Sequence, residues 1–73
     1  MNVRALKRVY FVGIGGIGMS ALARFFRNQG TVVNGYDRTE TALTKQLAAE
    51  GMGVHYTDDI NLLDKETELV VYT

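Results

Sequence analysis

The sequence predicts a three-layer α/β fold built on a parallel β-sheet. Short apolar runs, rich in β-branched and aromatic residues, alternate along the chain with stretches of helical periodicity. A cluster of glycines at residues 13–18 separates the first apolar run from the first helical stretch. Because connections between parallel strands are right-handed, this alternation favours a Rossmann-like, four-stranded sheet in the order 3-2-1-4. We expect a partial domain, because the chain stops on a strand.

Four strands and three helical segments are expected after a polar lead-in at residues 1–7. The first strand, Arg8–Val12, is apolar on both faces, which is typical of a central strand in a parallel sheet. The other elements are expected as strands at 31–36, 53–56 and 68–72, and as helices at 17–29, from 39–41 to about 50, and at 60–63. The face of the first helix that should meet the core carries Gly18, Leu22, Phe25 and Phe26.

Composition limits the classes of function. The chain has 73 residues, enough for one small domain, and its 8 Lys and Arg residues balance its 8 Asp and Glu residues. A net charge of zero argues against a nucleic-acid or membrane-surface footprint. The absence of cysteine excludes disulfides and thiolate chemistry in this segment. No apolar run approaches the ~20 residues that span a bilayer, so we expect a cytoplasmic protein.

The glycine cluster fits the spacing G-x-G-x-x-G at Gly13, Gly15 and Gly18. We expect Gly13 to turn the chain out of the strand, Gly15 to let a diphosphate approach the backbone, and Gly18 to let the helix pack closely on the strand. Asp37 ends the second strand 19 residues after Gly18, close to the spacing at which an acid meets a ribose hydroxyl. Gly35, inside that strand, is expected to mark a close approach of backbone or ligand.

Three acidic or basic candidates for other chemistry are expected to be structural. His55 is the single histidine, and because metal sites need several ligands it is expected to be a strand residue. Asp58 and Asp59 precede a short helix and are expected to cap it.

Residues 13–23, GIGGIGMSALA, closely resemble the start of the Mur ligase family of peptidoglycan synthesis. The resemblance extends over the whole segment, through Asn34-Gly35-Tyr36-Asp37 and through the strand that ends in Val70-Val71-Tyr72-Thr73. Tyr36 stands where the family usually has serine. The run is more specific than a bare dinucleotide fingerprint.

The resemblance implies an enzyme of three domains, which bind a UDP-sugar, ATP and an amino acid. It implies that the carboxylate of UDP-N-acetylmuramate is phosphorylated by ATP with Mg²⁺ and then attacked by the amine of L-alanine. Residues 1–73 would be the incomplete N-terminal, UDP-sugar-binding domain. The chain has no G-x-x-x-x-G-K-[ST] loop, so ATP and Mg²⁺ should bind outside it and the segment alone should be inactive.

The resemblance and the glycine pattern together predict a site for the UDP diphosphate, without catalytic residues or metal ligands in this segment. Its candidate residues are Gly13, Ile14, Gly15, Gly16, Ile17, Gly18, Met19, Ser20, Asp37 and Thr73. The N–H groups of Ile14, Ile17 and Met19 are expected to donate to phosphate. Ser20 either donates its hydroxyl to a phosphate or caps the first helical turn. Asp37 either accepts from ribose or uracil or starts a helix, and Thr73 lies at the rim.

Two other functions stay open. On physical grounds the glycine loop and Asp37 suit NAD equally well, as in one half of a dehydrogenase or a channel-regulator module. The segment could also be a non-catalytic structural piece with a vestigial loop. Whatever the function, an uncovered fourth strand would expose apolar surface, from which we expect possible self-association of the isolated segment.

Overall fold

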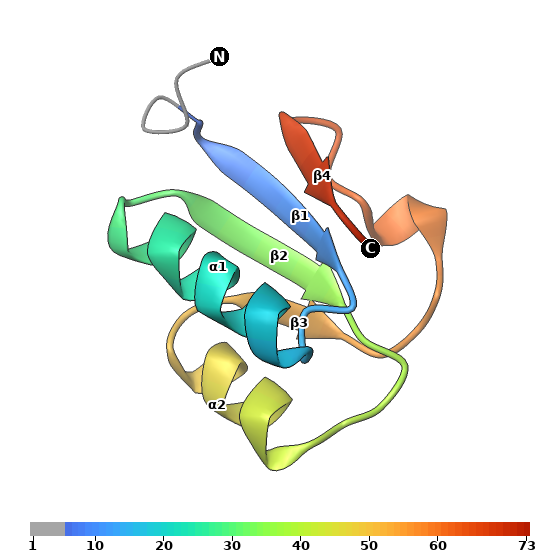
Figure 1. Ribbon diagram of the computed structural model, residues 1–73. Coiled ribbons are helices and arrows are strands. Elements are labelled where there is room, and N and C mark those ends of the chain that lie inside the picture. Colours follow the sequence, from blue (N-terminus) through green and yellow to red (C-terminus); the bar gives the residue numbers. More distant parts are fainter. Residues whose placement is uncertain (1–5) are drawn as a thin grey trace.

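The computed structural model describes residues 6–73 and has an α/β architecture (Figure 1). Most of the expected lead-in lies outside the described residues. The elements in chain order are β1 (Arg8–Val12), α1 (Ile17–Asn28), β2 (Val32–Tyr36), α2 (Ala42–Ala49), β3 (Gly53–His55), the 3₁₀ turn η2 (Ile60–Leu62) and β4 (Leu69–Val71). They match the expected elements in type and order, apart from the 3₁₀ turn where a short helix was expected.

The four strands form one parallel sheet in the order β3-β2-β1-β4, which confirms the predicted topology. The central strand, β1, pairs with β2 from Arg8 opposite Val32 to Val12 opposite Tyr36. On its other side, Tyr10 of β1 lies opposite Val70 of β4. The carboxyl ends of β1, β2 and β4 therefore meet at one edge of the sheet, where Figure 1 shows the glycine loop and the C-terminus.

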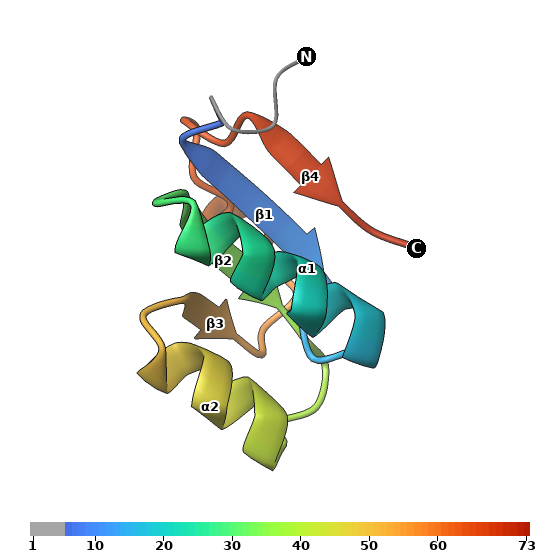
Figure 2. The same ribbon diagram turned by 60° about the vertical axis from the view of Figure 1, so that its left-hand side comes forward.

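Both α-helices lie on the same face of the sheet (Figure 2). The chain moves in one direction across the sheet, from β1 to β2 and then to β3. Because both crossovers are right-handed, their helices lie on the same face. The chain then returns past β1 to β4, and its connection, residues 56–68, provides the third layer with only η2 as regular structure. Within the part of the chain that the structure describes, neither helix is long and apolar enough to cross a membrane.

The core lies between the helices and the sheet. Alternate residues of β1 point to it, so Val9 and Phe11 are buried under α1 while Val12 is partly exposed. Phe11 meets Phe26 of α1 edge-to-face, with ring centroids 6.2 Å apart. The buried cluster consists of Leu6, Val9, Phe11, Ile14, Ala23, Phe26, Val33, Leu47 and Met52.

The buried face of α1 differs from the predicted one. Ser20, Ala23 and Phe26 are buried, whereas Leu22 and Phe25 are 39% and 45% exposed. The small side chains of Ser20 and Ala23 let the helix lie close to the sheet, and Phe26 packs edge-to-face on Phe11 of β1. Only Phe26 of the predicted face therefore enters the core, and the larger exposed pair lies to one side of it.

The helix–strand contact predicted for Gly18 is wrong. A Cβ atom at position 18 would have no atom within 4 Å outside its own helix and neighbours. The close approach occurs instead at Gly35, where a Cβ atom would lie 2.7 Å from Cδ1 of Ile14 and 3.0 Å from the Phe11 carbonyl oxygen. The expectation that Gly35 marks a close approach is confirmed, and the approaching group is the Ile14 side chain.

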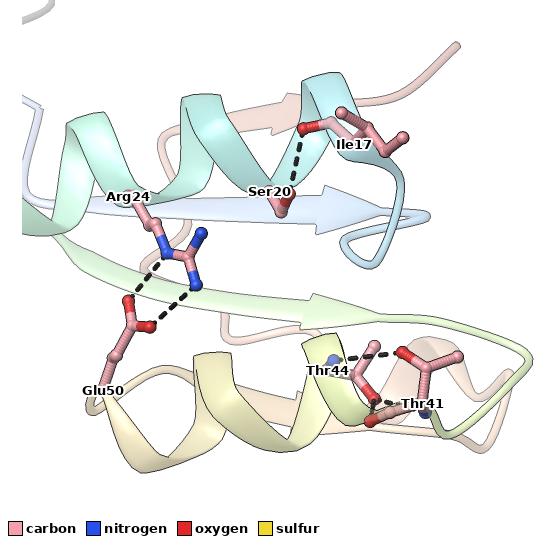
Figure 3. A network of polar contacts seen from close by, with 6 residues as sticks. All are labelled: Ile17, Ser20, Arg24, Thr41, Thr44 and Glu50. Carbon is pink, nitrogen blue, oxygen red and sulfur yellow. Dashed lines mark hydrogen bonds and ion pairs between the residues drawn. The ribbon is translucent and has the colours of Figure 1, made fainter.

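Helix α2 begins with a reciprocal cap. The side chain of Thr41 accepts from the Thr44 N–H at 3.1 Å, and the Thr44 hydroxyl accepts from the Thr41 N–H at 2.9 Å (Figure 3). The helix thus begins in the range expected from the sequence, with Thr41 and not Asp37 as its N-cap. At its other end Glu50 accepts two hydrogen bonds from Arg24 of α1, each 2.9 Å long.

Candidate functional site

The N–H groups of the glycine loop divide into two sets. The first set serves the fold: Gly13 and Ile14 both donate to the Tyr36 carbonyl oxygen, at 2.8 and 3.1 Å. Gly15 donates to Oδ2 of Asp37 at 2.8 Å, and Gly16 donates to the Gly13 carbonyl oxygen at 3.1 Å. The loop is therefore tied to the end of β2, and residues 13–16 have their donors engaged within the chain.

Two of these loop residues have clear structural roles. Gly13 has a φ of +84°, a conformation that side chains rarely adopt, which confirms that it forms the sharp exit from β1. Ile14 is fully buried against Gly35 and belongs to the core. Its N–H, which was expected to donate to phosphate, donates to Tyr36.

The second set of N–H groups lies in the first turn of α1. The helical ladder begins with the Ser20 N–H, which donates to the Gly16 carbonyl oxygen at 2.7 Å. The N–H groups of Ile17, Gly18 and Met19 precede that ladder and have no intrahelical acceptor. The N-cap, Gly16, has no side chain to cap them, and the first turn contains no acidic residue.

This helix end is electropositive and accessible. The three N–H groups, which have no acceptor outside the helix among residues 6–73, carry the positive end of the helix dipole, equivalent to about half an elementary charge. The Ile17 side chain is 88% exposed, and the space over Gly18 is empty of protein atoms. Together these features form a site suited to an anion such as a phosphate group.

Ser20 lies beneath this turn and not at its open end. Its side chain is buried, and its hydroxyl donates to the Ile17 carbonyl oxygen at 2.9 Å (Figure 3). The hydroxyl therefore neither caps the helix nor faces the free N–H groups.

Asp37 lies beside the loop, as the spacing predicted. Its Oδ2 accepts from the Gly15 N–H at 2.8 Å, and its Oδ1 accepts from the Thr39 N–H at 3.1 Å. Its own N–H donates to the His55 carbonyl oxygen at 3.1 Å, which fixes the residue to β3. Each carboxylate oxygen keeps a second lone pair for a ligand.

Thr73 follows β4 at the same edge of the sheet and is exposed. Among residues 6–73, no hydrogen bond joins it to the glycine loop. The structure thus brings the loop and Asp37 into direct contact and places Thr73 at the rim.

A pocket on the opposite face of the sheet was not foreseen from the sequence. It has a volume of about 300 Å³ and is lined by Tyr10, Val12, Tyr36, Asp58, Asp59, Leu63 and Val70. His55 is a strand residue, as expected, and its Nε2 lies 2.8 Å from the Tyr10 hydroxyl. Tyr10 and Val12 alternate along β1 with the core residues Val9 and Phe11, and this alternation is the sequence signal for a second face of the sheet. In residues 6–73, no three His, Cys, Asp or Glu side chains gather as a metal site.

Burial raises the pKa of the Tyr10 phenol, and the charges of Asp58 and Tyr36 raise it further. The folded pKa lies above that of an unfolded tyrosine, which is near 10. The protonated phenol therefore contributes stability below about pH 10, and this contribution is lost as the pH rises through the folded pKa. We expect the free energy of unfolding to fall more steeply in the wild type than in Tyr10→Phe as the pH rises above about 10. Urea unfolding at each pH measures it, with the exposed Tyr72→Phe as the control that keeps the wild-type slope. Equal slopes for wild type and Tyr10→Phe would contradict the assignment.

A comparison with known protein families supports the resemblance that the glycine loop indicated. The family profile described as "Mur ligase family, catalytic domain" matches residues 8–73. The chain belongs to the Mur ligase family. The resemblance inferred from residues 13–23 is confirmed by this match.

Several ligases align with all or nearly all of this chain, with about half of the aligned residues identical. The chain is 51% identical to the UDP-N-acetylmuramate–L-alanine ligase of Phocaeicola vulgatus and 48% identical to that of Flavobacterium johnsoniae, in each case over all of this chain and 17% of the relative. It is 52% identical to the enzyme of the same name from Porphyromonas gingivalis, over 93% of this chain and 16% of the relative. The chain therefore spans about 17% of the length of the Mur ligases that it matches.

Proposed function

We propose that this chain binds the nucleotide part of UDP-N-acetylmuramate for a ligase that joins L-alanine to that substrate. The uncapped N-terminus of α1, with three free N–H groups at the carboxyl edge of the sheet, carries the proposal. The names of the relatives supply the substrate, and the free N–H groups supply the means of binding its diphosphate.

The proposed roles differ among the candidate residues. The N–H groups of Ile17, Gly18 and Met19 donate to the diphosphate. The second lone pairs of the Asp37 carboxylate accept from a ribose hydroxyl or from uracil. Thr73 contacts the nucleotide at the rim. The remaining candidates, Gly13, Ile14, Gly15, Gly16 and Ser20, hold the loop and the first helical turn in place through the contacts described above.

The rest of the reaction is proposed to take place outside residues 1–73, which would be the first part of an N-terminal domain. When bound, ATP with Mg²⁺ would activate the carboxylate of UDP-N-acetylmuramate toward the amine of L-alanine. The chain has no P-loop, and the donors in residues 6–73 do not fit a metal ion. We propose that this segment binds and orients the UDP-sugar. Because ATP and UDP-sugars are cytoplasmic metabolites, we propose a cytoplasmic location.

Titration of the full ¹⁵N-labelled chain with UDP-N-acetylmuramate and with NAD tests the proposal. We expect the amide resonances of Ile17, Gly18 and Met19 to shift with the UDP-sugar, because its diphosphate takes their free N–H groups. Shifts with NAD alone would assign the chain to a dinucleotide-binding module. A folded sample that responds to neither ligand would leave a structural role.

A further inference from the structure

Thr44, in the first turn of α2, contacts all three loops that follow β1, β2 and β3 at the carboxyl edge of the sheet. Its methyl group lies against the glycine loop, because a Cβ atom at position 15 would be 2.7 Å from Cγ2 of Thr44. Its hydroxyl accepts from the Thr41 N–H at 2.9 Å and donates to the Thr41 carbonyl oxygen at 3.0 Å, at the end of the loop after β2 (Figure 3). It also accepts from the Tyr56 hydroxyl at 2.9 Å, in the loop after β3.

The Thr44 side chain has no freedom to reorient. A hydroxyl offers one donor and two acceptor sites, and these three hydrogen bonds use all of them. The side chain is also fully buried. It therefore does not touch a ligand at the surface, and any effect on binding acts through the residues that it holds.

The residues held in this way lead to the proposed nucleotide site. Gly15, which the Thr44 methyl group contacts, donates to Oδ2 of Asp37 at 2.8 Å. Tyr56 follows His55, whose carbonyl oxygen accepts from the Asp37 N–H at 3.1 Å. Thr44 is thus linked to Asp37 from two sides, through the glycine loop and through the end of β3.

We propose that Thr44 is a positioning residue for the nucleotide site at the carboxyl edge of the sheet. It keeps the glycine loop and the Asp37 carboxylate in contact before a ligand arrives, so that binding does not have to order them. The role rests on the proposed function, in which Asp37 accepts from the nucleotide and the adjoining N-terminus of α1 donates to its diphosphate.

Thr44→Ser tests the contact with Gly15. The substitution removes Cγ2 and keeps the hydroxyl with its three hydrogen bonds, so the cap of α2 is preserved. We expect the hydrogen bond from Gly15 to Asp37 to open more often, and the Gly15 amide hydrogen to exchange with solvent about tenfold faster relative to that of Phe11 in β1. We expect the affinity of the full chain for UDP-N-acetylmuramate, measured by calorimetry, to fall about threefold to tenfold.

Thr31→Ser is the matched control. Thr31 is also a buried threonine, and its hydroxyl donates to the Leu6 carbonyl oxygen at 2.9 Å. It stands immediately before β2, at the opposite edge of the sheet from the glycine loop. The control should lose a similar amount of stability, and it should leave both the relative Gly15 exchange rate and the ligand affinity at their wild-type values.

Tyr56→Phe tests the link through the loop after β3. It deletes the hydroxyl that donates to Thr44 and leaves the methyl contact with Gly15 in place. We expect the Asp37 amide hydrogen to exchange about threefold faster relative to that of Phe11, because the His55 carbonyl oxygen that accepts from it is held less firmly. An unchanged Asp37 rate would overturn this second link.

The outcomes separate the positioning role from the proposed function. A relative Gly15 exchange rate in Thr44→Ser that equals the wild-type rate would overturn the positioning role, even if the UDP-sugar binds. So would an affinity that falls as much in Thr31→Ser as in Thr44→Ser, because lost stability alone would then explain the change. If the wild-type chain did not bind UDP-N-acetylmuramate, the proposed function would fail, while the exchange rates would still decide whether Thr44 holds the loop.

Discussion

Gly35→Ala is expected to lower the free energy of unfolding by about 1–3 kcal/mol, the range for forcing extra volume into a packed core. The added methyl group would lie 2.7 and 2.9 Å from two atoms of the Ile14 side chain and 3.0 Å from the Phe11 carbonyl oxygen. Ile14 is fully buried and the carbonyl is backbone of the central strand, so neither can move aside cheaply. The φ of Gly35 is not positive, so the cost is steric and not conformational.

Urea unfolding of the full chain measures this loss, and Gly18→Ala is the matched control. A methyl group at position 18 meets no atom within 4 Å apart from its chain neighbours and the backbone of its own helix. Alanine also favours a helix over glycine by up to about 1 kcal/mol, so the control should be as stable as the wild type or more stable. Equal unfolding midpoints for the two variants would show that Gly35 does not make the close contact.

Ile17→Pro is expected to weaken UDP-N-acetylmuramate binding by about tenfold to a hundredfold, the equivalent of losing one hydrogen bond to a charged group. Proline deletes one of the three free N–H groups at the N-terminus of α1. The fold should tolerate it, because proline is favoured at the first position of a helix. The preceding residue, Gly16, already has the extended ψ of 150° that proline requires of its neighbour.

The affinity of the full chain for UDP-N-acetylmuramate, measured by calorimetry, gives the result. Ile17→Ala serves as the control, because it removes the same exposed side chain and keeps the N–H. We expect its affinity to stay within about twofold of the wild type, since the 88% exposed side chain leaves little packing to lose. Equal affinities for the proline and alanine variants would exclude the Ile17 N–H as a donor to the ligand.

The strand order and the glycine loop could be predicted from the sequence because they follow from local rules. Alternation of β-branched runs with helical periodicity, together with right-handed crossovers, leads to one parallel order. The threonines before α2 signalled its start, and the spacing from Gly18 to Asp37 indicated that acid and loop would meet. Each of these signals lies within a short stretch or depends on a general topological rule.

The partners of the individual loop atoms could not be predicted in this way. Three glycines in a motif look alike in the sequence, yet Gly13 makes the turn, Gly15 meets Thr44, and Gly18 faces open space. The buried face of α1 was mispredicted for a related reason. Size and periodicity favoured Leu22 and Phe25, but the helix packs through Ser20, Ala23 and Phe26.

The sequence by itself determined the fold class, the strand order and the membership of the Mur ligase family, because these depend on patterns within the chain. Only the tertiary structure decided which N–H groups of the loop are engaged and which are free. That division depends on where β2 and α2 place Tyr36, Asp37 and Thr44 against the loop. Such contacts join residues more than twenty positions apart, and their distances arise from packing of the whole core.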